Sequence, residues 1–369
     1  MQITKTIEKM EENKNEELNI PNQGDNQNNT NPPIAEPAIN AMEMQKEVAP
    51  ELMALTTKVH DATESIMREI NKVVIGQERT VELLFAALLT GGHVLLEGYP
   101  GIAKTLTAKT LAQTIKAQYS RIQFTPDLMP TDITGTSVFN MKESNFYFRK
   151  GPLFSNIILI DEINRAPAKT QAALMEVMEE KQITYDGETY RMEYPFFVVA
   201  TQNPIEQEGT YSLPEAQLDR FMFRIKLGYP NLEDEQKILH RYHSDFNKRV
   251  SQDVQAVITP EELKAYQEII EQVEIRPELL DYIAAIVHNT RNNGDLFLGA
   301  SPRASLAMMK TSKALAAMRG RFFVTPDDIK DVAVAVLNHR IVLSHEREME
   351  GHTVEEIIED ILKKVEVPR

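Results

Sequence analysis

The chain has 369 residues, of which 42% are hydrophobic and 26% charged, a composition typical of a soluble globular protein with about two domains. Its net charge of -15 argues against binding to nucleic-acid backbones as the main function, because that affinity comes largely from Lys and Arg. The absence of cysteine excludes disulfides, zinc–thiolate sites and cysteine nucleophiles.

The first predicted segment, residues 1–45, is a disordered tail. It is rich in Asn, Gln, Glu and Pro ("IPNQGDNQNNTNPPIAEP") and cannot bury enough apolar surface to offset the entropy of ordering. This terminus lacks the apolar core of a signal peptide, and the sequence contains no run of 18 apolar residues. We therefore expect a cytoplasmic protein without membrane insertion.

Residues 46–230 are predicted to form an α/β domain. A helical pattern runs from near Val48 to about Ile70, and an apolar helix follows a glycine break. Next come three buried strands, "HVLLE", "IILIDE" and "FFVVATQN", separated by the amphipathic helices "KTLTAKTLAQTI" and "KTQAALMEVMEE". This alternation is typical of a parallel sheet that helices cover on both faces.

Residues 231–369 are predicted to form a second, all-α domain, because strand patterns disappear. The starts of three helices are marked by "TPEE" at Thr259, "SPRA" at Ser301 and "TPDD" at Thr325. In the two TP motifs a Thr cap precedes a Pro at the first helical position and acids in the first turn, and "SPRA" repeats the cap and the Pro.

The stretch "GYPGIAKT" nearly matches the phosphate-binding loop G-x-x-x-x-G-K-[ST], with Ala103 in place of the second glycine. A methyl group there is tolerable if the backbone of Ala103 has a negative φ. The loop follows a predicted strand and precedes a predicted helix, where backbone N–H groups can wrap phosphates. A glycine-rich turn without a ligand is the alternative. The expected nucleotide contacts are Gly98, Pro100, Gly101, Ile102, Ala103, Lys104, Thr105 and Leu106.

Two adjacent acids, Asp161 and Glu162, end the predicted strand in "NIILIDEINRAP". Open α/β sheets bind ligands at this carboxyl edge. We expect Asp161 and Thr105 to hold magnesium, and Glu162 to polarise the water that attacks the γ-phosphate. An exposed acidic loop is the alternative interpretation.

The order of "GYPGIAKT", "LIDEINRAP", "ATQNP", "LPEAQLDRF" and "GASPRA" resembles the MoxR family of AAA+ ATPases, from about residue 48 to about residue 350. That family also has Ala before the loop Lys. The resemblance implies ATP and Mg²⁺ as cofactors. It also implies a P-loop AAA+ core with a parallel sheet, a helix-2 insert and a hairpin before the sensor-1 residue, followed by a small all-α lid.

The resemblance also implies roles for three residues beyond the loop. Asn203 is similar to the sensor-1 residue that helps to hold the attacking water, although a turn Asn before Pro204 is an alternative. Arg220 resembles an arginine finger that reaches the neighbouring subunit's γ-phosphate; from residue chemistry alone, a salt bridge to Asp219 or Glu215 is equally plausible. Arg303 resembles the sensor-2 arginine, which contacts the nucleotide from the lid side, with a structural Arg as the alternative.

Further segments resemble other family elements. Val74, Ile75 and Gln77 resemble the segment near the adenine. Residues 132–154 resemble the helix-2 insert, and residues 182–196 carry the hairpin signal Asp186-Gly187 between β-prone runs. Such elements usually point toward a ring face or pore, and plain surface loops are the alternative.

The main functional hypothesis is a magnesium-dependent ATPase that forms a homo-oligomer, with a hexameric ring expected, and remodels or matures a client protein. Functions within the family suggest clients with von Willebrand A domains or metalloenzyme subunits that await a cofactor. A nucleic-acid motor is one alternative, disfavoured by the acidic composition. The other is a nucleotide-gated scaffold with little turnover, disfavoured because a binding module has no need of Glu162 or a finger.

Overall fold

The computed structural model describes residues 39–204, 209–243 and 253–368. Most of the predicted tail lies outside these residues. Helix α2 (Ile39–Asn71) nevertheless begins within the predicted tail and earlier than the expected start near Val48, and it continues through Pro50. Residues 41–47, "AMEMQKE", are mostly strong helix formers, which explains the earlier start.

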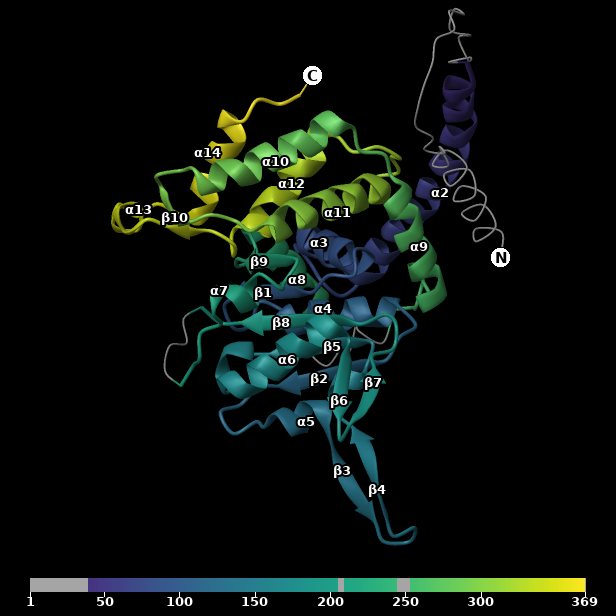
Figure 1. Cartoon of the computed structure of the whole chain (residues 1–369), viewed down its shortest axis with the longest axis vertical. Coiled ribbons are helices and arrows are strands. Elements are labelled where there is room, and N and C mark those ends of the chain that lie inside the picture. Colours follow the sequence, from purple (N-terminus) through teal and green to yellow (C-terminus); the bar gives the residue numbers. More distant parts are fainter. Residues whose placement is uncertain (1–38, 205–208, 244–252, 369) are drawn as a thin grey trace, which may run out of the picture.

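A five-stranded parallel sheet forms the centre of the first domain, in the strand order β2-β5-β8-β1-β9 (Figure 1). Three of its strands are those predicted from apolar runs, and an edge strand on each side completes the sheet. The strands are β1 (Val94–Gly98), β2 (Tyr119–Gln123), β5 (Ile157–Asp161), β8 (Phe197–Gln202) and β9 (Phe223–Leu227). Because β8 lies between β1 and β5, the segments that follow these three strands meet at one edge of the sheet.

Helices cover both faces of the sheet, because successive side chains of a strand point to opposite faces. Val94 and Leu96 of β1 belong to one hydrophobic cluster, which includes α2, α3 (Glu78–Leu89) and α4 (Lys104–Thr114). Leu95 belongs to a second cluster on the other face. The elements around that second face are α5 (Pro130–Thr134), η1 (Pro152–Phe154), η2 (Ile163–Arg165) and α6 (Ala168–Glu180).

Two antiparallel hairpins project from this domain (Figure 1). The first is β3 (Gly135–Asn140) with β4 (Asn145–Lys150), and the second is β6 (Gln182–Tyr185) with β7 (Glu188–Arg191). The predicted turn at Asp186-Gly187 is confirmed, with φ values of 53° and 82°. The ring of Phe148 in β4 stacks 4.5 Å from that of Tyr190 in β7, so the hairpins support each other.

The second domain is helical, as predicted, and the expected caps Thr259, Ser301 and Thr325 all precede helices. One expectation was wrong in detail, because two short strands, β10 (Leu296–Leu298) and β11 (Val342–Leu343), pair here. They are too short to give a strand pattern in the sequence. The helices are α9 (Pro260–Gln272), α10 (Pro277–Arg291), α11 (Pro302–Met318), α12 (Pro326–Leu337), α13 (His345–Met349) and α14 (Val354–Lys364).

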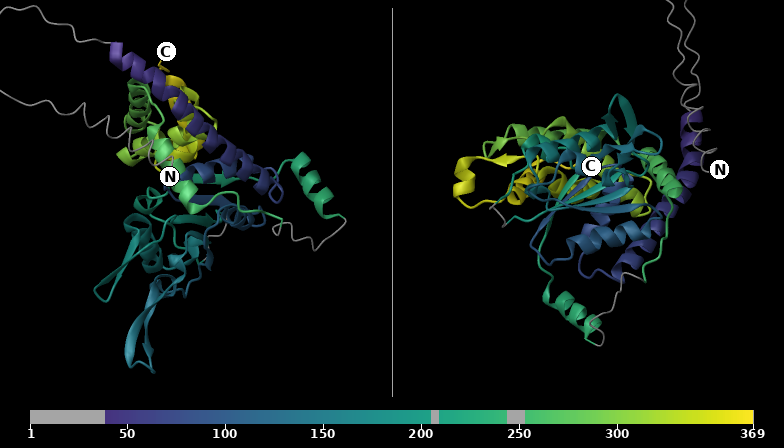
Figure 2. Two further views of the ribbon diagram at one scale, coloured as in Figure 1. Left: turned by 90° about the vertical axis from the view of Figure 1, so that its right-hand side faces the viewer. Right: turned by 90° about the horizontal axis from the view of Figure 1, so that it is seen from below.

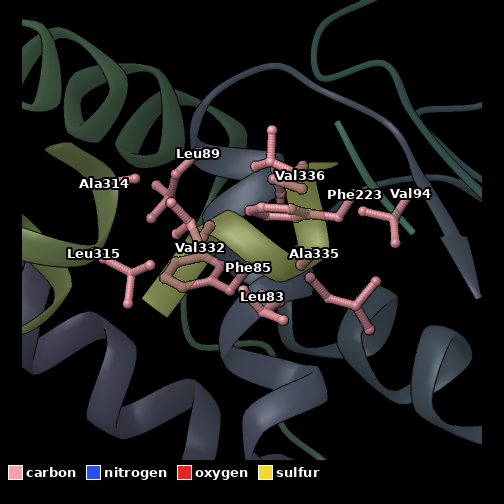
Figure 3. Packing of buried hydrophobic residues seen from close by; sticks show 14 of the residues in the cluster. Leu83, Phe85, Leu89, Val94, Phe223, Ala314, Leu315, Val332, Ala335 and Val336 are labelled. Carbon is pink, nitrogen blue, oxygen red and sulfur yellow. The ribbon is translucent and has the colours of Figure 1, made fainter. Parts of the chain in front are cut away.

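Two further helices, α7 (Glu215–Leu218) and α8 (Leu232–Tyr242), flank β9, and α8 stands away from the body (Figure 2). The two domains share one hydrophobic cluster. Figure 3 shows Phe85 of α3 close to Val332 of α12, with Phe223 of β9 beside Val336. Within the described part of the chain, no helix combines the length and apolar character needed to cross a membrane.

Candidate nucleotide site

The phosphate-binding loop connects β1 to α4 with a backbone unlike the one expected at Ala103. Its φ is +62°, in the left-handed region, so the expectation of a negative φ was wrong. The reason is that Ala103 is the N-cap of α4 and lies outside the helix, where the chain turns into it. Gly101, earlier in the loop, also has a positive φ, of 84°. A non-glycine residue in this region costs about 1–2 kcal/mol. The loop therefore holds strain at this residue.

Hydrogen bonds brace this strained loop. The Ala103 carbonyl accepts the Thr107 N–H at 2.9 Å and the Thr107 hydroxyl at 3.0 Å. Gln77 donates from Nε2 to the Ile102 carbonyl at 2.8 Å, and its Oε1 accepts from the Thr107 hydroxyl at 2.7 Å. The structure thus places Gln77 against the loop backbone, where it fixes the loop conformation.

Gly98 and Lys104 define the floor of the loop. A Cβ on Gly98 would lie 2.4 Å from Ile102 Cδ1 and 2.8 Å from the Leu227 carbonyl, so the close approach requires glycine. Lys104 Nζ donates to the Gly98 carbonyl and, at 3.4 Å, to the carbonyl of Gln202 in β8. The ammonium group therefore lies inside the loop, at the carboxyl edge of the sheet.

Asp161 ends β5 with a buried carboxylate whose two oxygens have different partners. Oδ1 accepts from the Thr105 hydroxyl at 3.2 Å and from the Thr201 hydroxyl at 3.3 Å. Oδ2 accepts from Arg121 Nε at 2.6 Å. A hydroxyl and a carboxylate are hard oxygen ligands of the kind Mg²⁺ prefers, so Thr105 and Asp161 fit the expected metal.

Glu162 also has a left-handed backbone, with φ 58°, stabilised by a hydrogen bond from its N–H to the Thr201 hydroxyl at 3.0 Å. Its Oε2 accepts from Gln123 Nε2 at 2.8 Å and lies 3.0 Å from Arg165 Nε. Backbone strain of this kind persists only where the surrounding structure fixes it, and it is common at functional sites.

One cavity of about 380 Å³ brings most of the expected residues together. Its lining adds Arg121, Gln123 and Thr201, which the sequence analysis did not identify. Arg121 and Gln123 alternate along β2. They could have been identified only by recognising β2 in the sequence as a strand that pairs with β5. The lining residues are Pro100, Gly101, Ile102, Ala103, Lys104, Thr105, Leu106, Arg121, Gln123, Asp161, Glu162, Thr201 and Asn203.

The proposed adenine residues do not line this cavity. Val74 is buried in the hydrophobic cluster beneath α3, and Ile75 is half-buried. The following Gly76 packs against α8, since a Cβ there would lie 2.5 Å from Asp234 Oδ2. This segment therefore connects the loop, through Gln77, to the start of α8.

Arg220 and Arg303 lie together in a second cavity, of about 230 Å³, that shares no lining residue with the first. Arg220 pairs with Glu179 and not with Asp219 or Glu215, through Nη2 at 2.7 Å from Glu179 Oε2. Arg303 Nη2 lies 2.7 Å from Glu179 Oε1. The hydrogen bond from Arg220 is the main reason that the pKa of Glu179 is lowered. Arg303 thus sits beside Arg220, in a cavity that no residue of the phosphate loop lines.

Comparison with known proteins finds similarity to ATPases of the AAA type. Residues 93–223 match the ATPase family associated with various cellular activities (AAA), and residues 288–361 match the AAA lid domain. A solved structure of a candidate ATPase from Cytophaga hutchinsonii superposes with a TM-score of 0.79 at 43% identity, covering 88% of this chain and 100% of that one.

Two curated relatives are similar over most of their length. YeaC of Bacillus subtilis is 43% identical over 316 residues, which are 86% of this chain and 98% of that protein. Chaperone MoxR1 of Mycobacterium tuberculosis is 41% identical over 324 residues, which are 85% of this chain and 84% of that protein. Together with the sheet, the loop and the lid, these matches show that the chain belongs to the MoxR family of AAA+ ATPases.

Proposed function

We propose that the chain binds ATP with Mg²⁺ in the larger cavity and hydrolyses it. The observation that carries this proposal is the pairing of Thr105 and Asp161 at 3.2 Å beside Lys104, on a loop that ends at a helix N-terminus. Backbone N–H groups there would bind the phosphates, and Lys104 would reach the β and γ groups. Bound magnesium, held by Thr105 and Asp161, would neutralise phosphate charge.

Glu162 and Asn203 act on the attacking water in this proposal. Both side chains line the cavity together with Lys104. The left-handed backbone of Glu162 carries its carboxylate beyond the end of β5, where Gln123 and Arg165 orient it. A carboxylate so placed can accept the proton of water, and the Asn203 amide can hold that water by a hydrogen bond.

Arg220 and Arg303 complete the site of a neighbouring subunit in a homo-oligomer, for which we propose a hexameric ring. Their common cavity and their separation from the phosphate loop of the same chain support this arrangement. In this proposal Arg303 contacts the nucleotide of the neighbouring subunit from the lid side, together with Arg220. Two guanidinium groups are suited to the negative charge that develops on the γ-phosphate.

The energy of hydrolysis would serve the remodelling or maturation of a client protein in the cytoplasm. The name of Chaperone MoxR1 supports a chaperone-like activity. The tip of the β3–β4 hairpin exposes apolar side chains, with exposed fractions of 48% for Phe139, 87% for Met141 and 64% for Phe146, which is a surface suited to a protein client. From the family resemblance we propose clients with von Willebrand A domains or metalloenzyme subunits.

The test is the ATP hydrolysis rate per subunit over a wide range of protein concentrations, with Glu162→Gln as the control for contaminating activity. A site shared between subunits predicts that the specific rate rises with concentration and that the control is inactive. A constant rate from a species with the mass of a monomer would contradict sharing. A rate no higher than that of the control would contradict the hydrolytic function.

A further inference from the structure

Glu179, in the last turn of α6, joins the two arginines of the smaller cavity. Its Oε2 accepts from Arg220 Nε at 2.8 Å and lies 2.7 Å from Arg220 Nη2, and its Oε1 accepts from Arg303 Nη2 at 2.7 Å. Each carboxylate oxygen thus serves a different arginine. Because Arg220 belongs to the α/β domain and Arg303 to α11 of the lid, one side chain aligns cations from both domains.

The other acid of the cavity, Asp219, is engaged elsewhere. It accepts from Arg340 Nε at 2.8 Å and from the Ser301 hydroxyl at 3.1 Å. Arg303 Nη1 lies farther away, at 4.0 Å from Asp219 Oδ2. The side chain of Arg340 is 3% exposed and that of Asp219 is 20% exposed, so Asp219 is held by a buried arginine. Glu179 is therefore the main anionic partner of Arg220 and Arg303.

The contacts of Glu179 with Arg220 and Arg303, here called the Glu179 bridge, leave both arginines able to bind a further anion. Three guanidinium groups against two carboxylates leave one positive charge in excess around the cavity. Glu179 occupies one edge of the Arg220 guanidinium, whose planar fork carries five N–H donors in all. Arg220 and Arg303 keep exposed fractions of 29% and 52%, so a phosphate carried by another subunit can approach them.

We infer that Glu179 is a positioning residue for the neighbouring subunit's ATP site, holding Arg220 and Arg303 as one pair of cations. This inference rests on the proposed sharing of the site between subunits. A carboxylate on an exposed surface contributes little to folding, so its removal should act on turnover. Without the bridge, two long and flexible side chains would have to be ordered anew in each catalytic cycle.

The first variant is Glu179→Gln, which keeps the size of the side chain and removes its charge. We expect kcat to fall by roughly tenfold to a hundredfold, the range that follows a small misplacement of catalytic groups, with nucleotide affinity and KM unchanged. The matched control is Glu180→Gln, which removes the same charge from the next residue and should keep the parental kcat. A Glu179→Gln protein with the parental kcat would overturn the inference.

The decisive experiment mixes full-length Glu179→Gln with Glu162→Gln subunits. The first has an intact ATP site and a disturbed arginine pair, and the second has the reverse. Turnover should recover where the intact arginine pair of a Glu162→Gln subunit faces the intact ATP site of a Glu179→Gln subunit. The mixture should therefore hydrolyse ATP faster than the sum of its components. Arg220→Ala mixed with Glu162→Gln serves as the reference for sharing.

The outcomes of these mixtures distinguish the role of Glu179 from the sharing of the site between subunits. Recovery in the Arg220→Ala mixture alone would mean that Glu179 acts within its own subunit, which would overturn the inference and leave the shared site standing. Recovery in neither mixture would contradict sharing itself, and the inference with it. Unchanged mass and unfolding temperature of each variant exclude misfolding as the cause.

Discussion

Arg121 Nε lies 2.6 Å from Asp161 Oδ2, so an arginine on the edge strand β2 neutralises the buried carboxylate at the end of β5. Asp161 has a side chain that is 7% exposed, whereas that of Arg121 is 54% exposed. Arg121 is thus the partner that reaches solvent, and Asp161 is the buried one. We expect the guanidinium to compensate the Asp161 charge while no divalent cation is bound.

Replacing Arg121 by Gln should therefore lower the stability of the nucleotide-free protein by about 1.5–3 kcal/mol, the usual contribution of a hydrogen bond to a charged group. The difference from the parent should shrink when Mg²⁺ and ADP are present, because the cation then compensates Asp161. Thermal unfolding with and without both ligands measures this. An equal difference in the two conditions would contradict the compensating role.

Substitutions at Lys104 and Glu162 should distinguish the loss of nucleotide binding from the loss of turnover. Lys104→Ala should weaken ATP binding, since its ammonium lies within the loop, and unchanged affinity would refute the assignment. Glu162→Gln should bind ATP as the parent does but lose about 100-fold to 10,000-fold in turnover, the usual contribution of a general base. Equilibrium binding of a fluorescent ATP analogue and steady-state hydrolysis are the two measurements.

Ala103→Gly should stabilise the protein by about 1 kcal/mol, because glycine adopts the left-handed backbone at φ 62° without steric cost. The matched control is Ala172→Gly, at an exposed position inside α6, where the same change should destabilise by about 1 kcal/mol. Denaturant unfolding gives both values. A loss of stability at residue 103 would show that the methyl group contributes packing that outweighs the strain.

His93 should make the protein sensitive to acid. Burial lowers its pKa from 6.5 to about 4, and its Nδ1 accepts the Val198 N–H at 3.0 Å, which leaves no room for a second proton there. Since the unfolded chain binds that proton more readily, stability is complete above about pH 6.5 and falls as the pH drops toward 4.

The loss attributable to His93 should approach about 3 kcal/mol at pH 4, because burial lowers the pKa of its imidazole from 6.5 to about 4. Unfolding by denaturant at a series of pH values measures it. The buried His339, whose pKa also lies well below 6.5, adds to the slope. A His93→Gln variant should show a shallower dependence, and an unchanged slope would exclude His93 as a source.

The sequence predicted those features that depend on local pattern. β1, β5 and β8 are continuous apolar runs, and the loop and the acids follow them directly, so their meeting at one edge followed from parallel strands. β2 was missed because an edge strand, "YSRIQ", carries polar side chains. The expectation of a negative φ at Ala103 was wrong because the sequence motif does not reveal at which residue the helical backbone begins.

The Glu179 bridge could not be predicted for a different reason. Its three members are 41 and 124 residues apart along the chain, and each has an ordinary surface-charge pattern of its own. The family resemblance indicated roles for Arg220 and Arg303 separately. Only the packing of the lid against the α/β domain shows that they share one carboxylate.

The hydrophobic cluster that unites α3, the sheet and the lid helices has a mechanical consequence. A hinge between the domains would expose Phe85, Val332 and Val336, which are buried in that cluster. At about 25 cal/mol for each Å² of apolar surface, such opening is costly. In the proposed ring, each subunit should therefore move as one rigid body, and conformational change should take place at the interfaces between subunits.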